Sequence, residues 1–544
     1  MSWRARLLAA ALGLAVFLPG IASRDLWNPD EPRYAEVTRE MRASGDWFVP
    51  HLNGAIYAEK PPLLFWLIGL ASFATGGVNE VAARLPSALA AIAALFCLFE
   101  IGRRWLDEPT AWLATLVYAS SAKILWQGRV GQIDMLLGAL VALAMLFWTR
   151  GFLERRPGFY RAFFVATGFA TLAKGPVGLL PPLLAIVAYL LATKRRDAIR
   201  DLRIPTGLLI WAAIVLLWLV PAVASAGREY FDTIVFRQNV TRYAEPWHHF
   251  QPFYYYLTIL PADFFPWFFF LPGALWLGWK RILDERRGGF AFALSWFLVT
   301  LVFFSLSPAK RTVYILSMYP GLALLVAVGL SEIGRHRDAL RRWAAIPAAI
   351  AAAIVGAAAI AIPPLARGRS ELAPLGPAFP WEVGGLLLAI ALAFAYGARV
   401  AARGRVARMT IAMAAGLAAA VAVASLLLLP QFNALKTARP LAQRLLALAT
   451  PSEPYAIYPR IDPPFLFYTR RFARLPRDEA ELQAYCRAAD RVWLLIQRDD
   501  LARLASPLPM FEVARDLDPV EGYVLMTNRL ADSEDLAKKL TPHV

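Results

Sequence analysis

The chain has 544 residues, of which 58% are hydrophobic, and its mean hydropathy is +0.48. This composition excludes an ordinary soluble protein, because soluble domains are only about 45–50% apolar. The net charge of +17 does not indicate nucleic-acid binding. Much of the charge lies in short connections between apolar blocks, where Lys and Arg orient membrane helices.

Apolar blocks of roughly 17–25 residues recur along the chain, and each can cross about 30 Å of hydrocarbon as a helix. The first block follows Arg4 and Arg6 like a signal peptide, but no small-residue cleavage site stands out. We therefore interpret it as an uncleaved first helix. In chain order the blocks predict thirteen spanning helices, near residues 7–23, 85–102, 110–126, 132–149, 160–173, 176–193, 205–224, 256–279, 289–306, 312–332, 342–363, 383–399 and 409–429.

Every second connection between these blocks is densely basic, and the positive-inside rule makes these connections cytoplasmic. They lie at residues 103–104, 150–161, 194–203, 280–287, 335–342 and 399–408. The N-terminus is then inside and the C-terminal tail outside. This alternation requires that the apolar block 63–73 does not span. It is short and follows Pro61-Pro62, so we interpret it as an interfacial or re-entrant segment.

The outer side carries three longer pieces. Residues 24–84 contain a predicted amphipathic helix near 31–43, which aligns Tyr34, Val37, Thr38 and Met41 on one face. The second piece is the connection 225–255. The third is the tail 431–544, where a helical pattern at 478–489 alternates with strand-like runs at 455–461, 491–497 and 522–527.

These features predict two domains. The first, residues 1–430, is a polytopic α-helical membrane domain that includes outer juxtamembrane helices within 24–84. The second, residues 431–544, is an outer α/β domain. The two cysteines, Cys97 and Cys486, lie in separate environments, so we expect no disulfide and no cysteine metal site.

The strongest local cluster of polar residues is Trp27 to Tyr34, directly after the first span. Its simplest interpretation is that Asp30 caps the next helix and Pro32 occupies the first turn. A carboxylate pair, Asp30 and Glu31, beside Arg33 at a membrane surface also suits recognition of a phosphate and a sugar. Capping and catalysis do not exclude each other, and Asp30 and Glu31 are candidate catalytic residues.

A second cluster, Tyr57 to Pro62, lies on the same outer segment. Lys60 is either an interfacial residue that extends its amine to water or a ligand of a lipid phosphate, held in place by two prolines. Tyr34 and Tyr57 are candidate substrate-binding residues beside it.

The third cluster is Arg129 and Asp134 at the outer end of the fourth predicted span. The helix dipole alone favours an aspartate in a first turn. However, ionisable residues in spanning segments are usually functional, and Arg129 is the nearest partner in sequence. We therefore predict that Asp134 is catalytic and that Arg129 binds substrate.

Further cations lie on the outer side, where membrane orientation does not require them, so an outward anionic ligand is the natural explanation. These are Lys174, Lys310 and Arg311. We take Lys310 and Arg311 as substrate-binding candidates, together with Tyr319 in the segment that follows them.

The adjacent histidines His248 and His249 share one outer loop. Such residues are more often ordinary surface side chains than ligands of one ion. The alternative is a divalent metal site, for Zn or Mg, that also includes Glu59.

The sequence contains no Walker loop, Rossmann glycine pattern, HExxH or GxSxG motif. All candidate acids and phosphate-binding bases lie on the outer face, where nucleotide sugars and ATP are not available. A transferase there needs a membrane-bound activated donor, such as a sugar on a polyprenyl phosphate. A transporter of lipid-linked sugars is the rival class, but such proteins usually have internal repeats and midplane sites.

Taken together, four motifs resemble the GT-C membrane glycosyltransferases, in particular the bacterial branch related to protein O-mannosyltransferases. They are Asp30 to Glu36, Glu59 to Pro62, Arg84 to Ala88, and Arg129 with Asp134. The similarity covers essentially the whole chain, although Met318 stands where the family more often has proline. The resemblance implies thirteen spans, a catalytic Asp30, and carrier-phosphate contacts from Arg33, Lys60 and nearby bases.

Within this branch the motifs are most similar to members that transfer 4-amino-4-deoxy-L-arabinose from undecaprenyl phosphate to lipid A. The resemblance therefore implies an undecaprenyl-phosphate-linked donor, a lipid A acceptor, and a bacterial inner membrane with the tail domain in the periplasm. Sister enzymes share the Asp-Glu cluster, so another sugar or a protein acceptor remains an open alternative.

Overall fold

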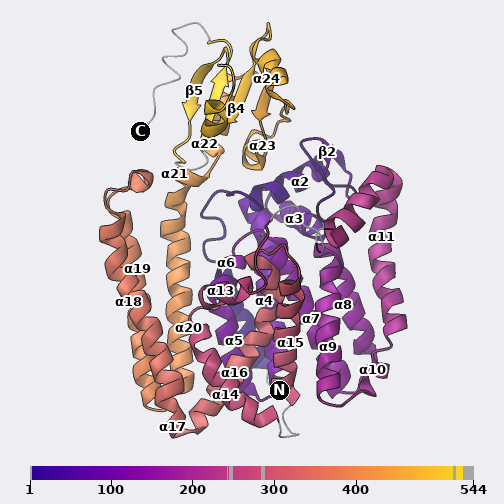
Figure 1. Ribbon diagram of the computed structural model, residues 1–544, viewed down its shortest axis with the longest axis vertical. Coiled ribbons are helices and arrows are strands. Elements are labelled where there is room, and N and C mark those ends of the chain that lie inside the picture. The colour runs from indigo at the N-terminus through magenta and orange to yellow at the C-terminus, as the bar shows by residue number, and fades with distance from the viewer. Residues whose placement is uncertain (1–2, 242, 244–248, 283–287, 519–521, 531–544) are drawn as a thin grey trace.

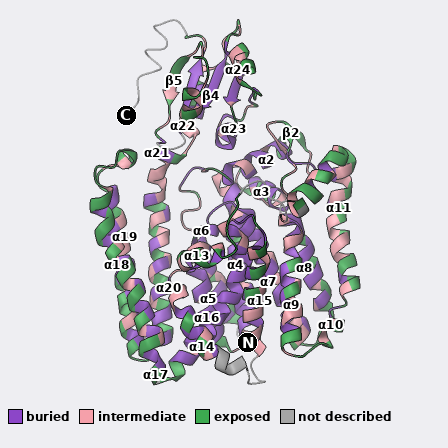
Figure 2. Cartoon of the chain, viewed as in Figure 1, coloured by how far each residue is buried: buried purple, intermediate pink, exposed green. Residues whose placement is uncertain are grey.

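The computed structural model describes residues 3–241, 243, 249–282, 288–518 and 522–530 (Figure 1). A bundle of long helices carries a small mixed domain at one end, and short helices of the first outer segment lie between the two. Buried residues concentrate where the long helices face one another, while the outward faces stay apolar and exposed (Figure 2). This is the pattern of a multi-pass membrane protein, whose outer faces meet lipid.

Eight helices of the described residues are long and apolar enough to cross a membrane, or nine if one pair bent by 108° forms a single span. The bent pair comprises α13 (Tyr255–Asp263) and η3 (Trp267–Phe270), which continues into α14 (Leu271–Ile282). The eight are α4 (Glu80–Trp105), α7 (Ile133–Leu153), α11 (Ile204–Phe231), α15 (Gly288–Leu306), α16 (Tyr319–Arg335), α18 (Ile346–Ala366), α19 (Phe379–Ala402) and α20 (Val406–Val423).

The remaining four predicted spans coincide with helices that are shorter. They are α1 (Trp3–Phe17), α5 (Glu108–Ala119), α8 (Gly158–Lys174) and α9 (Leu180–Ala192), with 15, 12, 17 and 13 residues. The predicted span 110–126 is divided between α5 and α6 (Ala122–Gln127). The break falls at Ser120 and Ser121, whose hydroxyls donate to carbonyls four residues earlier and so compete with the helical hydrogen bonds. The number thirteen stays a prediction.

Short helical segments connect or extend the spans. On the outer and central connections these are η1 (Pro176–Gly178), η2 (Asp232–Thr241), η4 (Thr312–Met318) and η6 (Ser370–Leu375). At the opposite end they are α10 (Ala198–Asp201), α17 (Arg337–Leu340) and η5 (Arg341–Ala345). The N-terminus, α10 and α17 all lie at the end of the bundle opposite the C-terminal domain (Figure 1). The sidedness expected from the basic connections is therefore consistent with the fold.

The first outer segment folds into α2 (Glu31–Ser44), a two-residue hairpin of β1 (His51–Leu52) and β2 (Ala55–Ile56), and α3 (Leu63–Ala74). The predicted amphipathic helix is confirmed, because Tyr34, Val37, Thr38 and Met41 are all buried. The block 63–73 forms α3, which has 12 residues. At about 1.5 Å per residue this helix is too short to cross a bilayer.

The C-terminal domain contains a four-stranded sheet in the order β3-β4-β6-β5. Strand β3 (Tyr455–Tyr458) is parallel to β4 (Trp493–Gln497), and β6 (Tyr523–Thr527) is antiparallel to β4 and to β5 (Phe511–Arg515). Tyr455 pairs with Trp493, and Trp493 pairs with Thr527. The helices are α22 (Arg439–Leu448), α23 (Pro463–Thr469), α24 (Glu479–Cys486) and α25 (Arg498–Ala502). The three predicted strands and the predicted helix α24 are present, whereas β5 was not predicted.

The C-terminal domain contacts the chain immediately before α2. It follows α20 through η7 (Ala424–Leu428), η8 (Leu429–Phe432) and α21 (Asn433–Lys436). Asn433 accepts hydrogen bonds from the Asp25 amide at 3.1 Å and the Trp27 indole at 2.9 Å. Arg439 forms an ion pair with Asp25 at 2.8 Å. These contacts fix the segment that leads into Asp30.

Candidate functional site

Asp30 immediately precedes α2, but its side chain does not cap that helix. Its Oδ2 atom accepts hydrogen bonds from Gln132 Nε2 at 2.8 Å and from Arg311 Nη2 at 3.1 Å. The Tyr34 hydroxyl lies 3.5 Å from Oδ1. The capping interpretation is therefore wrong for this side chain. Three separate parts of the chain instead hold the carboxylate at the wall of a cavity.

The electrostatics keep Asp30 ionised. Burial acts to raise the pKa of this carboxyl, but Arg311, the Gln132 hydrogen bond and Arg33 outweigh burial, so the pKa lies below its usual value. Arg311 is the strongest of these opposing influences. A carboxylate in this state offers a fixed negative charge at neutral pH.

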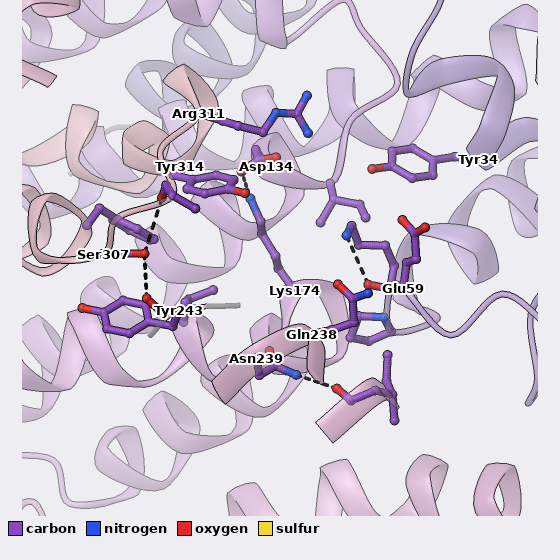
Figure 3. Close-up of a pocket in the computed structure, with 17 residues that line it drawn as sticks. Tyr34, Glu59, Asp134, Lys174, Gln238, Asn239, Tyr243, Ser307, Arg311 and Tyr314 are labelled. Carbon is purple, nitrogen blue, oxygen red and sulfur yellow. Dashed lines mark hydrogen bonds and ion pairs between the residues drawn. The ribbon is translucent and has the colours of Figure 1, made fainter. Parts of the chain in front are cut away.

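Two adjoining cavities share Glu59, Lys60, Gln238 and Arg311 in their walls. One, of about 1580 Å³, is lined by Asp30, Arg33 and residues of α11 and η2. The other, of about 880 Å³, is lined by Tyr34, Asp134, Lys174 and residues near the end of α15 (Figure 3). The first is bordered by the cations Arg33, Lys60, Arg237 and Arg311 and by the carboxylates of Asp30, Glu59 and Glu229. The cations exceed the acids by one, which favours an anionic group in this cavity.

Asp134 forms an ion pair with Lys174, which projects from the end of α8 (Figure 3). The Tyr314 ring lies 4.3 Å from the Lys174 ammonium. The expected partnership of Asp134 with Arg129 is therefore wrong. Arg129 is buried, donates to the carbonyls of Leu125 and Val16, and lines neither cavity.

Glu31 is buried away from both cavities. It accepts from Arg24 at 2.8 Å, from Arg84 at 2.7 Å and from the Gly131 amide at 2.9 Å. Burial alone would raise its pKa, yet Arg84 and Arg24 lower it to about 2. These contacts hold Glu31 at the start of α2, away from both cavities, and its catalytic role stays a prediction.

The second cluster does reach the cavities. Lys60 lines both, and its ammonium donates to the Glu59 carbonyl at 3.1 Å. The Glu59 carboxylate accepts from the Tyr57 hydroxyl at 3.3 Å and lies 3.8 Å from Arg33. Burial raises the pKa of Tyr57, so this side chain stays neutral and donates. Arg33, Tyr57 and Lys60 are therefore held close together, as expected for a substrate-binding group.

Four predicted substrate-binding residues do not line these cavities: Tyr57, Arg129, Lys310 and Tyr319. Lys310 is buried and donates to the carbonyls of Gln251 at 3.0 Å and Ser307 at 2.5 Å. Tyr319 is buried at the start of α16, with its ring against Phe264. Lys310 therefore supports the loop that presents Arg311, and Tyr319 belongs to the core of the bundle.

The predicted metal ligands are only partly described. His248 lies outside the described residues, while Glu59 and His249 both line the cavity that contains Asp30. Within the described ranges, no three His, Cys, Asp or Glu side chains are grouped so as to hold a metal ion. The divalent metal stays an untested prediction.

Several residues at the site were not among the predicted site residues. Gln132 donates to Asp30. The amides Gln238 and Asn239 and the hydroxyl side chains Tyr243, Ser307 and Tyr314 line the cavity that contains Lys174. Lys174 was noted only as an outer cation. Lys174 is a cation on the outer side, where the positive-inside rule does not require one. This was the one signal in the sequence that could have marked it as a site residue. Gln132 could have been suspected from its place between Arg129 and Asp134.

The class of protein follows from comparison with known structures and families. The family model for dolichyl-phosphate-mannose-protein mannosyltransferases matches residues 59–223. The crystal structure of ArnT from Cupriavidus metallidurans bound to undecaprenyl phosphate matches with a TM-score of 0.81 and 24% identity. That match covers 96% of this chain and 98% of ArnT. The chain therefore has the GT-C fold, and the resemblance expected from the motifs is confirmed.

Sequence relatives point to one particular group of proteins with this fold. An "undecaprenyl phosphate-alpha-4-amino-4-deoxy-L-arabinose arabinosyl transferase 2" from Sodalis glossinidius is 35% identical over 333 residues, 59% of this chain and 58% of the relative. A transferase of the same description from Edwardsiella ictaluri is 32% identical over 343 residues, 61% and 60% of the two chains. The aligned part thus spans about three fifths of these relatives.

Proposed function

We propose that this chain is a glycosyltransferase that moves 4-amino-4-deoxy-L-arabinose from undecaprenyl phosphate to a phosphate of lipid A. The observation that carries the proposal is Asp30. Its carboxylate is held by Arg311 and Gln132 at the wall of a cavity bordered by four cations. The sequence relatives named as aminoarabinose transferases support the choice of sugar and carrier.

The cations suit a lipid phosphate as the leaving group. During transfer the bond between the anomeric carbon and the carrier phosphate oxygen breaks, and its electron pair stays on that oxygen. Positive side chains fixed beside this oxygen stabilise the growing charge. Arg33, Lys60 and Arg311 border the larger cavity, and Lys174 borders the adjoining one.

The state of Asp30 fits an acceptor that is already anionic. A hydroxyl acceptor would need a general base to remove its proton, and a base with a lowered pKa is weak. A phosphate oxygen attacks the anomeric carbon without losing a proton. In our proposal Asp30 therefore orients the sugar and stabilises positive charge on it, including the charge of its amino group. Asp134, paired with Lys174, is the second acid of the site.

The proposed location is the bacterial inner membrane, with the C-terminal domain in the periplasm. The basic connections that contain α10 and α17 lie at the opposite end of the bundle, which supports this orientation by the positive-inside rule. The site lies beside α2 at the domain end rather than near the middle of the bundle, which favours a surface transferase over a transporter.

The direct test uses the purified full chain with a synthetic undecaprenyl-phosphate aminoarabinose donor and lipid A. Mass spectrometry should detect a pentosamine-sized increase in lipid A. Asp30→Asn should lower the rate by a factor of about 10²–10³, the range expected when one preorganised electrostatic stabiliser is lost. Its unfolding temperature should stay close to that of the unchanged chain.

A matched control is Asp499→Asn, which removes an exposed carboxylate of the C-terminal domain and should leave the rate unchanged. Full activity in Asp30→Asn would overturn the assignment of that residue. Product formed only with a different carrier-linked sugar or acceptor would redirect the proposal to a sister transferase.

A further inference from the structure

An apolar groove lies apart from the reaction site, between α3, α4 and α7. Its volume, with the open side included, is about 1190 Å³. All its lining residues are apolar, including Leu70 and Phe73 of α3, Leu89 and Ala93 of α4, and Leu140 and Leu143 of α7. The lining positions recur every three or four residues on each helix, so one face of each helix meets the groove. Leu70, Phe73 and Leu89 are strongly exposed, so the groove is open to the surroundings of the bundle.

The depth of the groove matches one leaflet of a bilayer. Along α4 it runs from Leu85 to Cys97, which are 12 positions apart. At 1.5 Å per residue this is about 18 Å, a little more than half of the ~30 Å hydrocarbon core. It begins five positions after Glu80, where α4 starts at the domain end. A lipid chain from the leaflet at that end would fit this length.

A cation lies at the mouth of the groove. The Arg42 guanidinium, at the end of α2, is 5.0 Å from the ring of Phe73. One of its nitrogens donates to Ser72 Oγ at 2.9 Å. No carboxylate of the described residues forms an ion pair with Arg42, whereas Arg39, one turn earlier, is paired with Glu36 at 2.6 Å. An exposed cation without an acid, above an apolar groove, suits the phosphate of a lipid headgroup.

The geometry separates this groove from the reaction. Asp30 and Arg42 are 12 positions apart, about 18 Å along the helix, so a phosphate held by Arg42 cannot be the reacting one. Helix α7 lies between the two spaces, because Asp134 lines the reaction cavity and Leu136 to Leu143 line the groove. The occupant is therefore a lipid that does not react.

We propose that this groove binds an anionic phospholipid of the bilayer, with one acyl chain between α3, α4 and α7 and its phosphate on Arg42. The bound lipid fills the space behind α3. Because α3 follows Lys60 and Pro61, it also supports the segment that lines the reaction cavity.

Native mass spectrometry of the full chain, in micelles containing equal amounts of phosphatidylglycerol and phosphatidylcholine, tests the proposal. The unchanged chain should retain phosphatidylglycerol preferentially. Arg42→Ala should weaken its retention about five-fold, the equivalent of about 1 kcal/mol for one basic residue at a membrane surface. The matched control is Arg367→Ala, because Arg367 also lies over an aromatic ring, 4.9 Å from Trp381, but far from the groove.

A second pair of variants tests the groove itself. Ala93→Leu places bulk inside it and should displace the lipid, whereas Ala353→Leu adds the same bulk to an exposed position of α18 and should not. Equal retention of the two lipids by the unchanged chain would overturn the role of charge. Unchanged retention in Arg42→Ala and Ala93→Leu would overturn the site, as would retention of a polyprenyl phosphate or phosphorylated glycolipid in place of the phospholipid.

Discussion

Asp30 and Glu31 are neighbours in sequence but occupy opposite environments. Asp30 lines a cavity and faces Arg311, whose side chain is 30% exposed. Glu31 is enclosed by Arg24 and Arg84, whose side chains are 5% and 0% exposed. Both carboxylates are ionised and paired, yet only Asp30 can meet a substrate. The comparison teaches that a salt bridge alone does not identify a reactive carboxylate. In our proposal, the accessibility of its partner distinguishes Asp30 from Glu31.

The largest effect on folding is expected from Glu31→Gln. This change leaves Arg24 and Arg84 buried without their counter-charge, and breaking one partner of a buried ion pair costs about 3–5 kcal/mol. The unfolding free energy should fall by that amount, measured by chemical unfolding in a fixed detergent. Asp30→Asn should cost less than about 1 kcal/mol by the same measurement, because Arg311 can reach solvent.

The two residues should also differ in the pH dependence of stability. The pKa of Glu31 is about 2 in the folded chain, below the ordinary value of about 4.3. Its contribution is therefore complete above pH ~4.5 and is lost as the pH falls toward 2. In Glu31→Gln, this loss of unfolding free energy at low pH should be absent. An equal loss of stability in Asp30→Asn and Glu31→Gln would contradict the comparison.

Arg311→Gln should have the next largest effect, this time on activity. It removes a partly buried charge beside Asp30, for which a loss of about 2.7 kcal/mol, or 100-fold in rate, is expected. The pKa of Asp30 should rise when Arg311 no longer opposes burial. The acid limb of the pH–rate profile should therefore move to higher pH. An unshifted limb would show that Arg311 does not control Asp30.

Much of the fold could be predicted from the sequence, because apolar blocks and basic connections act locally. Helix α2 followed from the spacing of Tyr34, Val37, Thr38 and Met41, all of which are buried. Strand β5 was missed because the alternation of apolar and polar residues that identifies a strand is short in it. It covers Phe511 to Val513 and ends where the pairing shifts register between Glu512 and Ala514.

The site was predicted only in part, because its contacts join distant segments. Asp30, Lys60 and Arg311 were found by residue type and position. The partner of Asp134 was assigned from proximity in sequence to Arg129, but Lys174 comes from a different helix. Glu31 could not be distinguished from Asp30 until Arg84 and the Gly131 amide were seen to enclose it. Sequence spacing carries no information on such contacts.

A moderate effect on activity should distinguish Lys174 from Arg129. Lys174→Met removes a cation from the cavity, so the KM for the donor should rise at least about ten-fold, which corresponds to 1.4 kcal/mol. Arg129→Met should leave this KM unchanged and lower the unfolding temperature, because Arg129 donates to two backbone carbonyls and lines neither cavity. Donor titrations and thermal unfolding of both variants provide the measurements. A raised KM in Arg129→Met alone would restore the substrate-binding role first predicted for Arg129.

The smallest expected effect on stability comes from Asp516. Unlike Asp30 and Glu31, this carboxylate has no cation among the described residues close enough to offset the cost of its burial. Burial raises its pKa to about 6, and Arg498, at 3.4 Å, opposes burial only partly. The folded chain therefore holds this proton more tightly than the unfolded chain, whose ordinary value is about 3.9. Stability is then greatest below pH ~4 and declines as the pH rises toward 6. Because Asp516 is partly exposed, we expect a decline of about 1 kcal/mol.

Hydrogen exchange of the β4 and β6 amides in the full chain, corrected for intrinsic rates, measures this effect without separating the domain. Protection should fall between pH 4.5 and 6.5 in the unchanged chain and stay level in Asp516→Asn. The window lies above that of Glu31, so the two contributions can be separated on the pH axis. Protection that rises with pH over this range would mean that Arg498 outweighs burial, and Asp516 would then resemble Glu31 instead of contrasting with it.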